Sequence, residues 1–251
     1  SVDLIAAEDT RHSRRLFQQF AIDTPCFAYH EFSDRGAQER VLTRLAQGEA
    51  VALVSDAGTP LISDPGFRLV RDVQEAGFRV FPVPGACAAI AALCVSGLPT
   101  DRFVFEGFLP AKAGARAARL LELAAEESTT IFYEAPHRIV DSLQAMVEAF
   151  GGDREAVLAR EITKAYETVR RAPLVELAGF VAADSNQQRG EIVLVVAGRP
   201  PGQPQLDTRL AALLQRLAQE MPGKRAAAIV AEFSGLKKNQ LYDYLLAQRS
   251  D

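Results

Sequence analysis

The sequence predicts an α/β fold followed by a helical segment. Over residues 1–100, short apolar runs alternate with amphipathic stretches, which is the pattern of strands joined by crossover helices in a parallel sheet. Over residues 101–198 the apolar runs follow one another more closely, which indicates a second, mixed sheet. After the stretch rich in Pro and Gly at residues 198–204, only helical spacing remains.

The first part of the chain predicts a parallel sheet. Each expected strand is apolar and bounded by polar residues, Gly or Pro. Because parallel strands need right-handed crossovers, their carboxyl ends meet at one edge, where ligands bind. We expect residues 1–100 to be an N-terminal α/β domain. A strand is already in progress at residue 2, so we expect the sequence to begin inside this fold, with a segment missing upstream. Strands are expected near residues 2–7, 25–29, 50–54 and 79–83, and helices near 10–20, 35–47, 65–76 and 86–96.

The second part, residues 101–198, is expected to be a second α/β domain with a mixed sheet. Its expected strands are 103–105, 129–133, 156–160, 165–171 and 191–196, and its expected helices are 112–126, 138–150 and 173–183.

Residues 205–251 are expected to form a helical domain. A helix begins at the acidic cap Asp207 and carries leucines at helical spacing, and two further helices run to about 233 and from about 238. Their spacing resembles a helix-turn-helix, although an ordinary helical hairpin fits equally well.

Composition limits the functional classes. The 251 residues are 48% hydrophobic and 24% charged, which is typical of a globular chain. No apolar run reaches the ~18–20 residues of a membrane span, and no signal peptide is visible, so we expect no membrane contact and a cytoplasmic location. Three cysteines without CxxC spacing predict neither a zinc site nor a disulfide framework, and no metal cluster is visible. The net charge of −4 argues against a chain coated in basic residues, but the segment after Pro204 has seven Lys and Arg against five Asp and Glu.

Two breaks in the motif VALVSDAGTPLISDPG suggest a ligand-binding loop. The apolar run 51–54 ends in Ser-Asp-Ala-Gly-Thr-Pro, and a second Ser-Asp-Pro-Gly follows at 63–66. An acidic side chain in each break, with Gly and Pro fixing the backbone, indicates a rigid loop built to meet a ligand. The alternative is a tight connection from strand to helix. Residues 84–88 open another helix, whose first amide groups are unpaired and can bind a ligand.

Seven ordered motifs then resemble those of the ribosomal RNA small subunit methyltransferase I family, which lies within the tetrapyrrole methylase superfamily. The resemblance covers essentially the whole chain, including the helical tail. It departs at the amino end, where the family's first strand and its Gly-containing loop are not in this sequence, and at Ala86, where a proline is common. The motifs are AEDTRHSRRL, LVSDAGTPLISDPGFRLV, VPGACAAIAAL, GLPTDRFVFEGFLP, FYEAPHR, REITK and GEIVLVV.

The resemblance implies two α/β domains of the tetrapyrrole methylase type with S-adenosyl-L-methionine (SAM) in the cleft between them. It implies 2'-O-methylation of a cytidine ribose in 16S rRNA of the small ribosomal subunit, by a homodimer. Such a transfer is an in-line displacement, so alignment matters more than reactive side chains. The positions that match the family's cofactor contacts are Ala57, Gly58, Thr59, Ile62, Cys87, Ala88, Tyr133, Ile162 and Gly190. Cys87 and Tyr133 could equally be buried packing residues.

The catalytic base is harder to assign. A carboxylate, lysine or arginine close to the ribose hydroxyl would accept its proton or stabilise the developing oxyanion, and we expect Glu134, Arg138 and Lys164 to do so. Glu134 and Arg138 could instead form a local ion pair, and Lys164 could lie at a solvated strand end. His137, Arg160 and Glu161 are further candidates, and Arg11, His12 and Arg14 could bind RNA phosphate.

Two other functions remain open at this stage. One is a SAM-dependent methyltransferase of the same superfamily acting on a tetrapyrrole or another small molecule, against which the basic helical tail counts. The other is a non-catalytic RNA-binding module.

Overall fold

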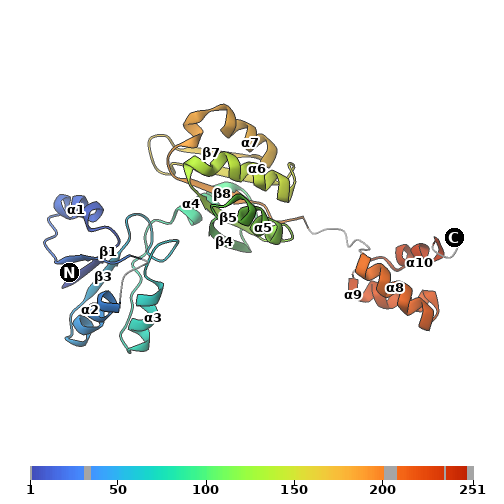
Figure 1. Ribbon diagram of the computed structural model, residues 1–251, viewed down its shortest axis with the longest axis horizontal. Coiled ribbons are helices and arrows are strands. Elements are labelled where there is room, and N and C mark those ends of the chain that lie inside the picture. Colours follow the sequence, from blue (N-terminus) through green and yellow to red (C-terminus); the bar gives the residue numbers. More distant parts are fainter. Residues whose placement is uncertain (1, 31–34, 201–207, 235, 248–251) are drawn as a thin grey trace. The chain divides into compact units, whose positions relative to one another are not determined.

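The computed structural model describes residues 2–30, 35–200, 208–234 and 236–247. The chain divides into two compact units, Ser1–Gly198 and Arg199–Asp251 (Figure 1). The first unit contains a three-stranded and a five-stranded sheet, and the second is helical. The predicted division of the first unit near residue 100 falls between these two sheets.

The first sheet is parallel, as predicted. Its order is β2 (Cys26–Ala28), β1 (Leu4–Ala7) and β3 (Val51–Val54), so β1 is central and wholly buried. Helices α1 (Thr10–Gln19), α2 (Arg35–Ala46) and α3 (Phe67–Glu75) follow the strands in turn. One face of the sheet packs against α2 and α3 through a cluster formed by Ala6, Tyr29, Val41, Leu69 and Val73. The carboxyl ends of all three strands therefore lie at one edge.

The predicted strand near residues 79–83 is wrong. The chain from α3 to α4 (Ala88–Ser96) forms neither a strand nor a helix, and the side chain of Val83 is 88% exposed. Val80 and Phe81 are also exposed. Within the described residues no strand pairs with this segment. An apolar segment needs a neighbour to complete its hydrogen-bond ladder, so its sequence pattern alone does not make it a strand.

The second sheet is mixed, as predicted. Its order is β4 (Phe103–Phe108), β5 (Thr129–Glu134), β8 (Ile192–Val196), β6 (Glu155–Arg160) and β7 (Thr168–Pro173). Strands β4 and β5 are parallel, and the remaining neighbours are antiparallel. Two short 3-10 turns, Pro136–Arg138 and Ser185–Gln188, were not expected from the sequence.

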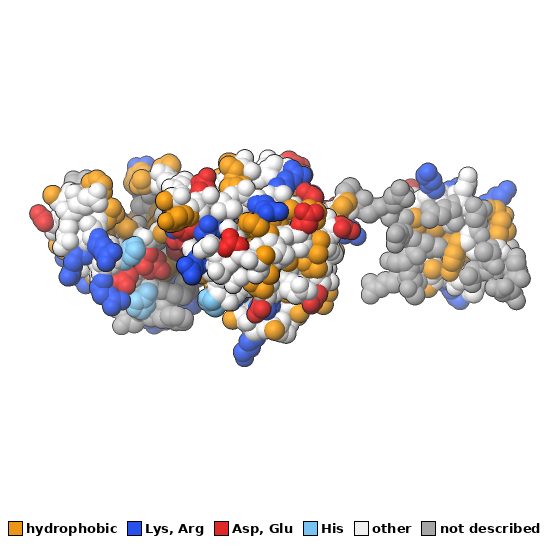
Figure 2. Space-filling view, turned by 90° about the horizontal axis from the view of Figure 1, so that it is seen from above, with side chains coloured by type: hydrophobic (Ala, Val, Ile, Leu, Met, Phe, Trp, Pro, Cys, Tyr) orange, Lys and Arg blue, Asp and Glu red, His pale blue; other side chains and the backbone are white. Residues whose placement is uncertain are grey.

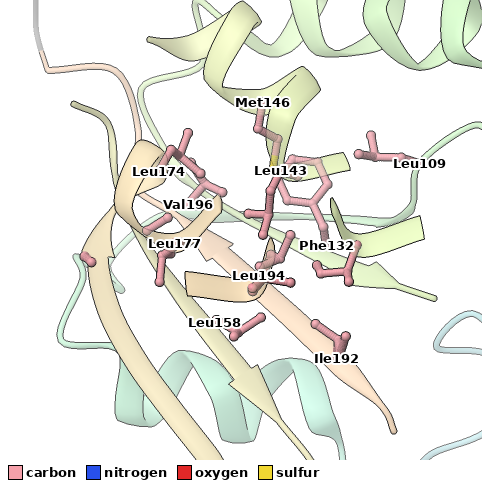
Figure 3. Close-up of a cluster of buried hydrophobic side chains, with 14 of the residues drawn as sticks. Leu109, Phe132, Leu143, Met146, Leu158, Leu174, Leu177, Ile192, Leu194 and Val196 are labelled. Atoms are coloured by element: carbon pink, nitrogen blue, oxygen red, sulfur yellow. The ribbon is translucent and has the colours of Figure 1, made fainter. Parts of the chain in front are cut away.

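Alternating side chains give the second sheet two apolar faces. Phe132, Leu158 and Leu194 lie on one face, in a cluster with residues of α5 (Ala113–Leu123), α6 (Ile139–Phe150) and α7 (Leu174–Ala183) (Figure 3). Ile131, Val157, Ala159, Val193 and Val195 lie on the other face and pack against α4. The period of two along each strand therefore sends neighbouring residues into separate cores.

The second unit contains α8 (Thr208–Glu220), α9 (Gly223–Ser234) and α10 (Lys238–Ala247), as predicted. They share a small core built from Leu214, Ala226, Ala227, Val230, Leu236, Leu241 and Leu245. The predicted cap at Asp207 and the glycine of the predicted turn, Gly235, lie outside the described residues. Within the described part of the chain, no helix combines the length and apolar character needed to cross a membrane.

Two adjacent leucines of α5 give a test of the second core. Leu120 is fully buried in the cluster under α5, α6 and α7, whereas Leu121 is 65% exposed. Leu120→Ala should lower the free energy of unfolding by about 2–5 kcal/mol, because it removes buried methyl groups and leaves a cavity. Leu121→Ala should change it by no more than about 0.5 kcal/mol. Urea unfolding of both variants measures the difference, and equal losses would contradict this placement of α5.

Candidate functional site

The loop between β3 and α3 is held in an unusual backbone conformation. Gly58, Leu61, Ser63 and Gly66 all have positive φ angles, of 73°, 74°, 64° and 134°. Left-handed backbone is unfavourable for residues with a side chain by roughly 1–2 kcal/mol, so Leu61 and Ser63 must be held there by their surroundings. A Cβ atom at Gly66 would come within 2.6 Å of the Leu53 side chain. The loop is therefore a fixed structure, as the two breaks in its sequence predicted.

A hydrogen bond ties this loop to the segment before α4. Thr59 donates from Oγ1 to the carbonyl oxygen of Ala86 at 2.8 Å. A Cβ atom added to Gly58 would lie 3.7 Å from the same oxygen. The chain then enters α4 through Cys87, whose side chain makes no capping hydrogen bond.

Tyr133 connects the start of α4 to the second sheet. Its hydroxyl oxygen accepts a hydrogen bond from the backbone N–H of Ala89 at 3.2 Å. Its ring contacts Phe105 and Phe108 edge to face, at centroid distances of 5.1 and 5.7 Å. Burial raises the pKa of Tyr133 to about 12, so the phenol is neutral at pH 7. This ring gives the site an apolar wall with one fixed polar atom.

A second constrained turn lies beside Ile162. Glu161 and Thr163 have positive φ angles of 51° and 66°. The Glu161 carboxylate accepts hydrogen bonds from Lys164 Nζ and from the backbone N–H of Glu191, both at 2.9 Å. A Cβ atom at Gly190 would push the Glu161 side chain aside, and the positive φ of 79° at Gly190 also favours glycine there.

The structure brings the predicted cofactor residues together through a chain of contacts. Gly58 and Thr59 lie against Ala86, next to Cys87. Cys87, Ala88, Tyr133 and Ile162 pack in one cluster beneath α4, and Gly190 lies under Glu161, which precedes Ile162. Ala57 and Ile62 flank this set in the loop after β3, where the Ile62 N–H donates to the Thr59 carbonyl oxygen at 3.3 Å. Residues far apart in sequence thus share one region, and their contact with a cofactor stays a prediction.

The predicted catalytic groups Glu134 and Arg138 are largely enclosed by protein partners. Glu134 is only 2% exposed, and its carboxylate accepts hydrogen bonds from Ser142 Oγ at 2.5 Å and from the Ala135 N–H at 2.8 Å. Arg138 Nε lies 3.3 Å from the same carboxylate, and Arg138 Nη2 donates to the Leu109 carbonyl oxygen at 2.6 Å. This geometry favours a positioning role, in which the pair joins the start of α6 to the end of β4.

Lys164 and Arg160 also have partners, whereas His137 is on the surface. Lys164, half-exposed, pairs with Glu161 at 2.9 Å and with Glu191 at 3.2 Å, and these contacts raise its pKa. Arg160 is buried and donates to Tyr166 and Thr168. His137 is exposed in the 3-10 turn.

A group of acidic side chains lies where β1 and β3 end. The sequence pattern had assigned no role to this group. Glu8 Oε2 accepts the Asp56 N–H at 3.1 Å, and Asp56 Oδ1 accepts the Asp9 N–H at 3.1 Å. Burial, followed by the charges of Glu8 and Asp56, raises the pKa of Asp64 above its ordinary value. The sequence contains a signal that could have revealed this group, because each break of the loop motif carries an acidic residue. Among the described residues, no group of His, Cys, Asp and Glu has the arrangement of a metal site.

Comparison with known proteins identifies the family. The model of the Tetrapyrrole (Corrin/Porphyrin) Methylases matches residues 1–178, and that of the RsmI C-terminal HTH domain matches residues 204–249. The chain is 56% identical over 250 residues to ribosomal RNA small subunit methyltransferase I of Pseudomonas aeruginosa, covering 99% of this chain and 89% of that protein. The chain belongs to this family. The protein of the same name from Escherichia coli O157:H7 is 50% identical over 249 residues, covering 99% of this chain and 87% of that protein.

Solved structures support the same fold at low sequence identity. The methyltransferase CobJ superimposes with a TM-score of 0.56 at 18% identity, covering 80% of this chain and 86% of that one. The cobalt precorrin-4 methyltransferase CbiF superimposes with a TM-score of 0.55 at 15% identity, covering 78% of this chain and 84% of that one. These likenesses show the tetrapyrrole methylase fold.

Family membership makes the chain a SAM-dependent methyltransferase. The residues present fit this cofactor. Adenosine and an aliphatic sulfonium chain need apolar surfaces with a few fixed polar groups. Ile162, Phe105 and the neutral Tyr133 supply apolar surface in this methyltransferase. Gly58 is exposed, so its main-chain groups are accessible to a ligand.

Substitution of two glycines can distinguish a loss of cofactor contact from the effect of backbone strain. Gly58 and Gly48 have similar φ angles, 73° and 82°, but Gly48 lies in the turn after α2, with no atom within 4 Å of an added Cβ. Both Gly58→Val and Gly48→Val should lose about 1–3 kcal/mol of stability, because valine is strained at positive φ. Only Gly58→Val should weaken SAM binding, by more than tenfold. Calorimetric titration and thermal unfolding measure both quantities, and parental SAM affinity in folded Gly58→Val would remove the loop from the cofactor site.

Substitution of two glutamates compares the stability contributed by a buried ion pair with that contributed by a surface ion pair. Glu134→Ala should destabilise the protein by about 3–5 kcal/mol, because it leaves Arg138 without its buried partner. Glu155→Ala removes the partner of Arg171, in a pair whose side chains are about half-exposed, and should cost no more than about 1 kcal/mol. Denaturant unfolding compares them. The positioning role also predicts that folded Glu134→Gln still transfers methyl groups, and a complete loss of transfer with parental stability would instead make Glu134 catalytic.

Proposed function

We propose that this methyltransferase transfers the methyl group of SAM to the 2'-hydroxyl of a cytidine ribose in 16S rRNA of the small ribosomal subunit. The observation that carries the proposal is the match to ribosomal RNA small subunit methyltransferase I over nearly the whole chain, including the C-terminal HTH domain at residues 204–249. A role for Ala57, Gly58, Thr59, Ile62, Cys87, Ala88, Tyr133, Ile162 and Gly190 in holding SAM is part of the proposal.

The arrangement of the site supports such a transfer. SAM supplies an activated methyl group, and the protein's main task is to align it with the attacking oxygen. The fixed loop after β3 would hold the cofactor by its backbone. Tyr133, Phe105 and Ile162 would exclude water from the reacting atoms. We retain Glu134 and Arg138 as groups that position the end of β5, and Lys164 as a group that holds the turn beside Ile162 through its pairing with Glu161.

Exposed cations near the site support an RNA substrate. Helix α1 begins at the carboxyl end of β1 and exposes Arg11, Arg14 and Arg15 to solvent. Figure 2 shows Lys, Arg and His side chains gathered around Asp and Glu side chains over one part of the first unit. In the second unit Lys224, Arg225, Lys237 and Lys238 are exposed. Such residues would neutralise RNA phosphates at both ends of the chain.

The same proposal includes a homodimer working in the cytoplasm, where small ribosomal subunits are assembled. Strand β4 is an edge strand of the second sheet, and its Phe103 and Phe108 remain about half-exposed. Apolar groups on a sheet edge favour contact with a second copy. Light scattering at micromolar concentration tests this, and a mass of 27.2 kDa would count against it.

The substrate is tested with radioactive SAM and purified small ribosomal subunits from cells that lack this methyltransferase. We expect one methyl group per subunit, located at a cytidine whose 3'-phosphodiester bond becomes resistant to alkali, because cleavage there requires a free 2'-hydroxyl. Large subunits and a tetrapyrrole acceptor serve as controls. Labelling of the tetrapyrrole, or of a base instead of a ribose, would overturn the proposal.

A further inference from the structure

A small cavity lies at the carboxyl edge of the first sheet, and the function described so far does not use it. It has a volume of about 250 Å³ and is lined by Tyr29, His30, Gly66, Phe67 and Arg68. The first two of these residues follow β2, and the last two begin α3. The cavity therefore lies at the edge of the sheet where α/β proteins bind their ligands.

The core of the first sheet holds two walls of this cavity in place. The Tyr29 N–H donates to the carbonyl oxygen of Ala7, in β1, at 2.7 Å. Tyr29 and Leu69 are both buried in the apolar cluster that packs under α2 and α3. Leu69 directly follows Arg68, so the same cluster anchors the start of α3. The cavity is therefore formed before any ligand binds.

Phe67 offers an aromatic ring at this cavity. The residue is 68% exposed, although it begins a helix whose Leu69 and Val73 are buried. A single exposed apolar side chain is ordinary on a protein surface. This one, however, lines a concave space and stands next to a cation. An exposed ring in such a place gives a flat ligand a face on which to stack.

The cation is Arg68, which is exposed to solvent. Within the described part of the chain, no hydrogen bond or ion pair involves its guanidinium group. Arg71, one turn further along α3, instead pairs with Asp72 at 2.8 Å and with Glu75 at 3.7 Å. Arg68 is thus available to an anionic ligand, whereas the charge of Arg71 is already compensated.

A shared loop links the cavity to the proposed cofactor site. Gly66, in the cavity wall, closes the loop that follows β3, and Gly58 and Thr59 of the same loop lie against Ala86. A Cβ atom at Gly66 would lie 2.6 Å from the side chain of Leu53 in β3, so the loop returns to the strand from which it started. A ligand in the cavity would therefore touch the same loop as the cofactor.

We propose that this cavity binds a nucleotide of the substrate RNA next to the methylated cytidine, with its base stacked on Phe67 and its phosphate paired with Arg68. The inference rests on the proposed function. An aromatic face beside a cation matches the two parts of a nucleotide, which are a flat base and an anionic phosphate. The volume suits a single base, because pockets for drug-sized ligands measure roughly 300–1,000 Å³.

The first test is Phe67→Ala. The Kd for purified small ribosomal subunits, measured without SAM, should rise roughly 5–100-fold, because a base loses its stacking partner. The Kd for SAM, measured by calorimetric titration, should not change. Phe67→Tyr keeps the aromatic face and should restore subunit binding. The matched control is Phe20→Ala, which removes a ring of similar exposure, 63%, from the end of α1 and should bind subunits like the parent.

The second test is Arg68→Gln. It should weaken subunit binding and lower the slope of log Kd against log salt concentration by about 0.7, because one phosphate contact with single-stranded RNA is lost. Arg71→Gln is the matched control on the same helix and should leave the slope unchanged, because Arg71 is already paired. Thermal unfolding of all four exposed positions should match the parent.

Three results would overturn the inference. These are an affinity of Phe67→Ala for subunits equal to that of Phe20→Ala, a salt slope that Arg68→Gln does not change, or a loss of SAM affinity in Phe67→Ala as large as the loss for subunits, which would place the cofactor in the cavity. The salt slope decides the question even if Phe67→Ala fails to fold. A parent that methylates no RNA overturns the proposed function and this inference together, whereas an active parent whose Phe67→Ala variant binds subunits normally overturns this inference alone.

Discussion

The left-handed backbone of the loop after β3 is the constraint on which the rest of the site depends. Leu61 and Ser63 adopt conformations that an isolated chain would avoid, and the buried Pro65 and Gly66 anchor the end of the loop in the first sheet. The Thr59 hydrogen bond to Ala86 then positions the entry into α4. Because the loop is already ordered, the cofactor would bind without a large cost in backbone entropy.

Helix α4 links the loop to the second sheet. Its alanines and Leu93 pack on the face formed by Ile131, Val157 and Val193, while its first turn receives the Tyr133 hydroxyl. A helix that follows the first sheet in sequence is thereby held by the second. The site lies at the ends of helices and strands, and two hydrophobic cores fix the positions of these elements. Side chains far apart in sequence are therefore held close together there.

Much of the fold could be predicted from periodicity, because burial imposes a period of two on strands and of 3.6 on helices. The failure at residues 79–83 has a physical cause: Val80, Phe81 and Val83 have a strand pattern, but ladder formation depends on a partner that a local pattern does not encode. The cofactor residues were inferred from motif resemblance, and the structure supports their proximity to one another. Local sequence could not show that Glu134 is buried against Ser142, eight residues away, or that Asp64 has two carboxylates near it, because both facts depend on packing between elements.

The contact between Gly190 and Glu161 couples two positions that are 29 residues apart in the sequence. Any side chain at position 190 would overlap Glu161, and the positive φ of 79° there penalises every residue with a Cβ. Glu161 in turn holds Lys164 and the backbone of Glu191. A side chain at residue 190 would therefore push the Glu161 carboxylate away from both of these groups, so the effect of changing one position depends on the residue at the other.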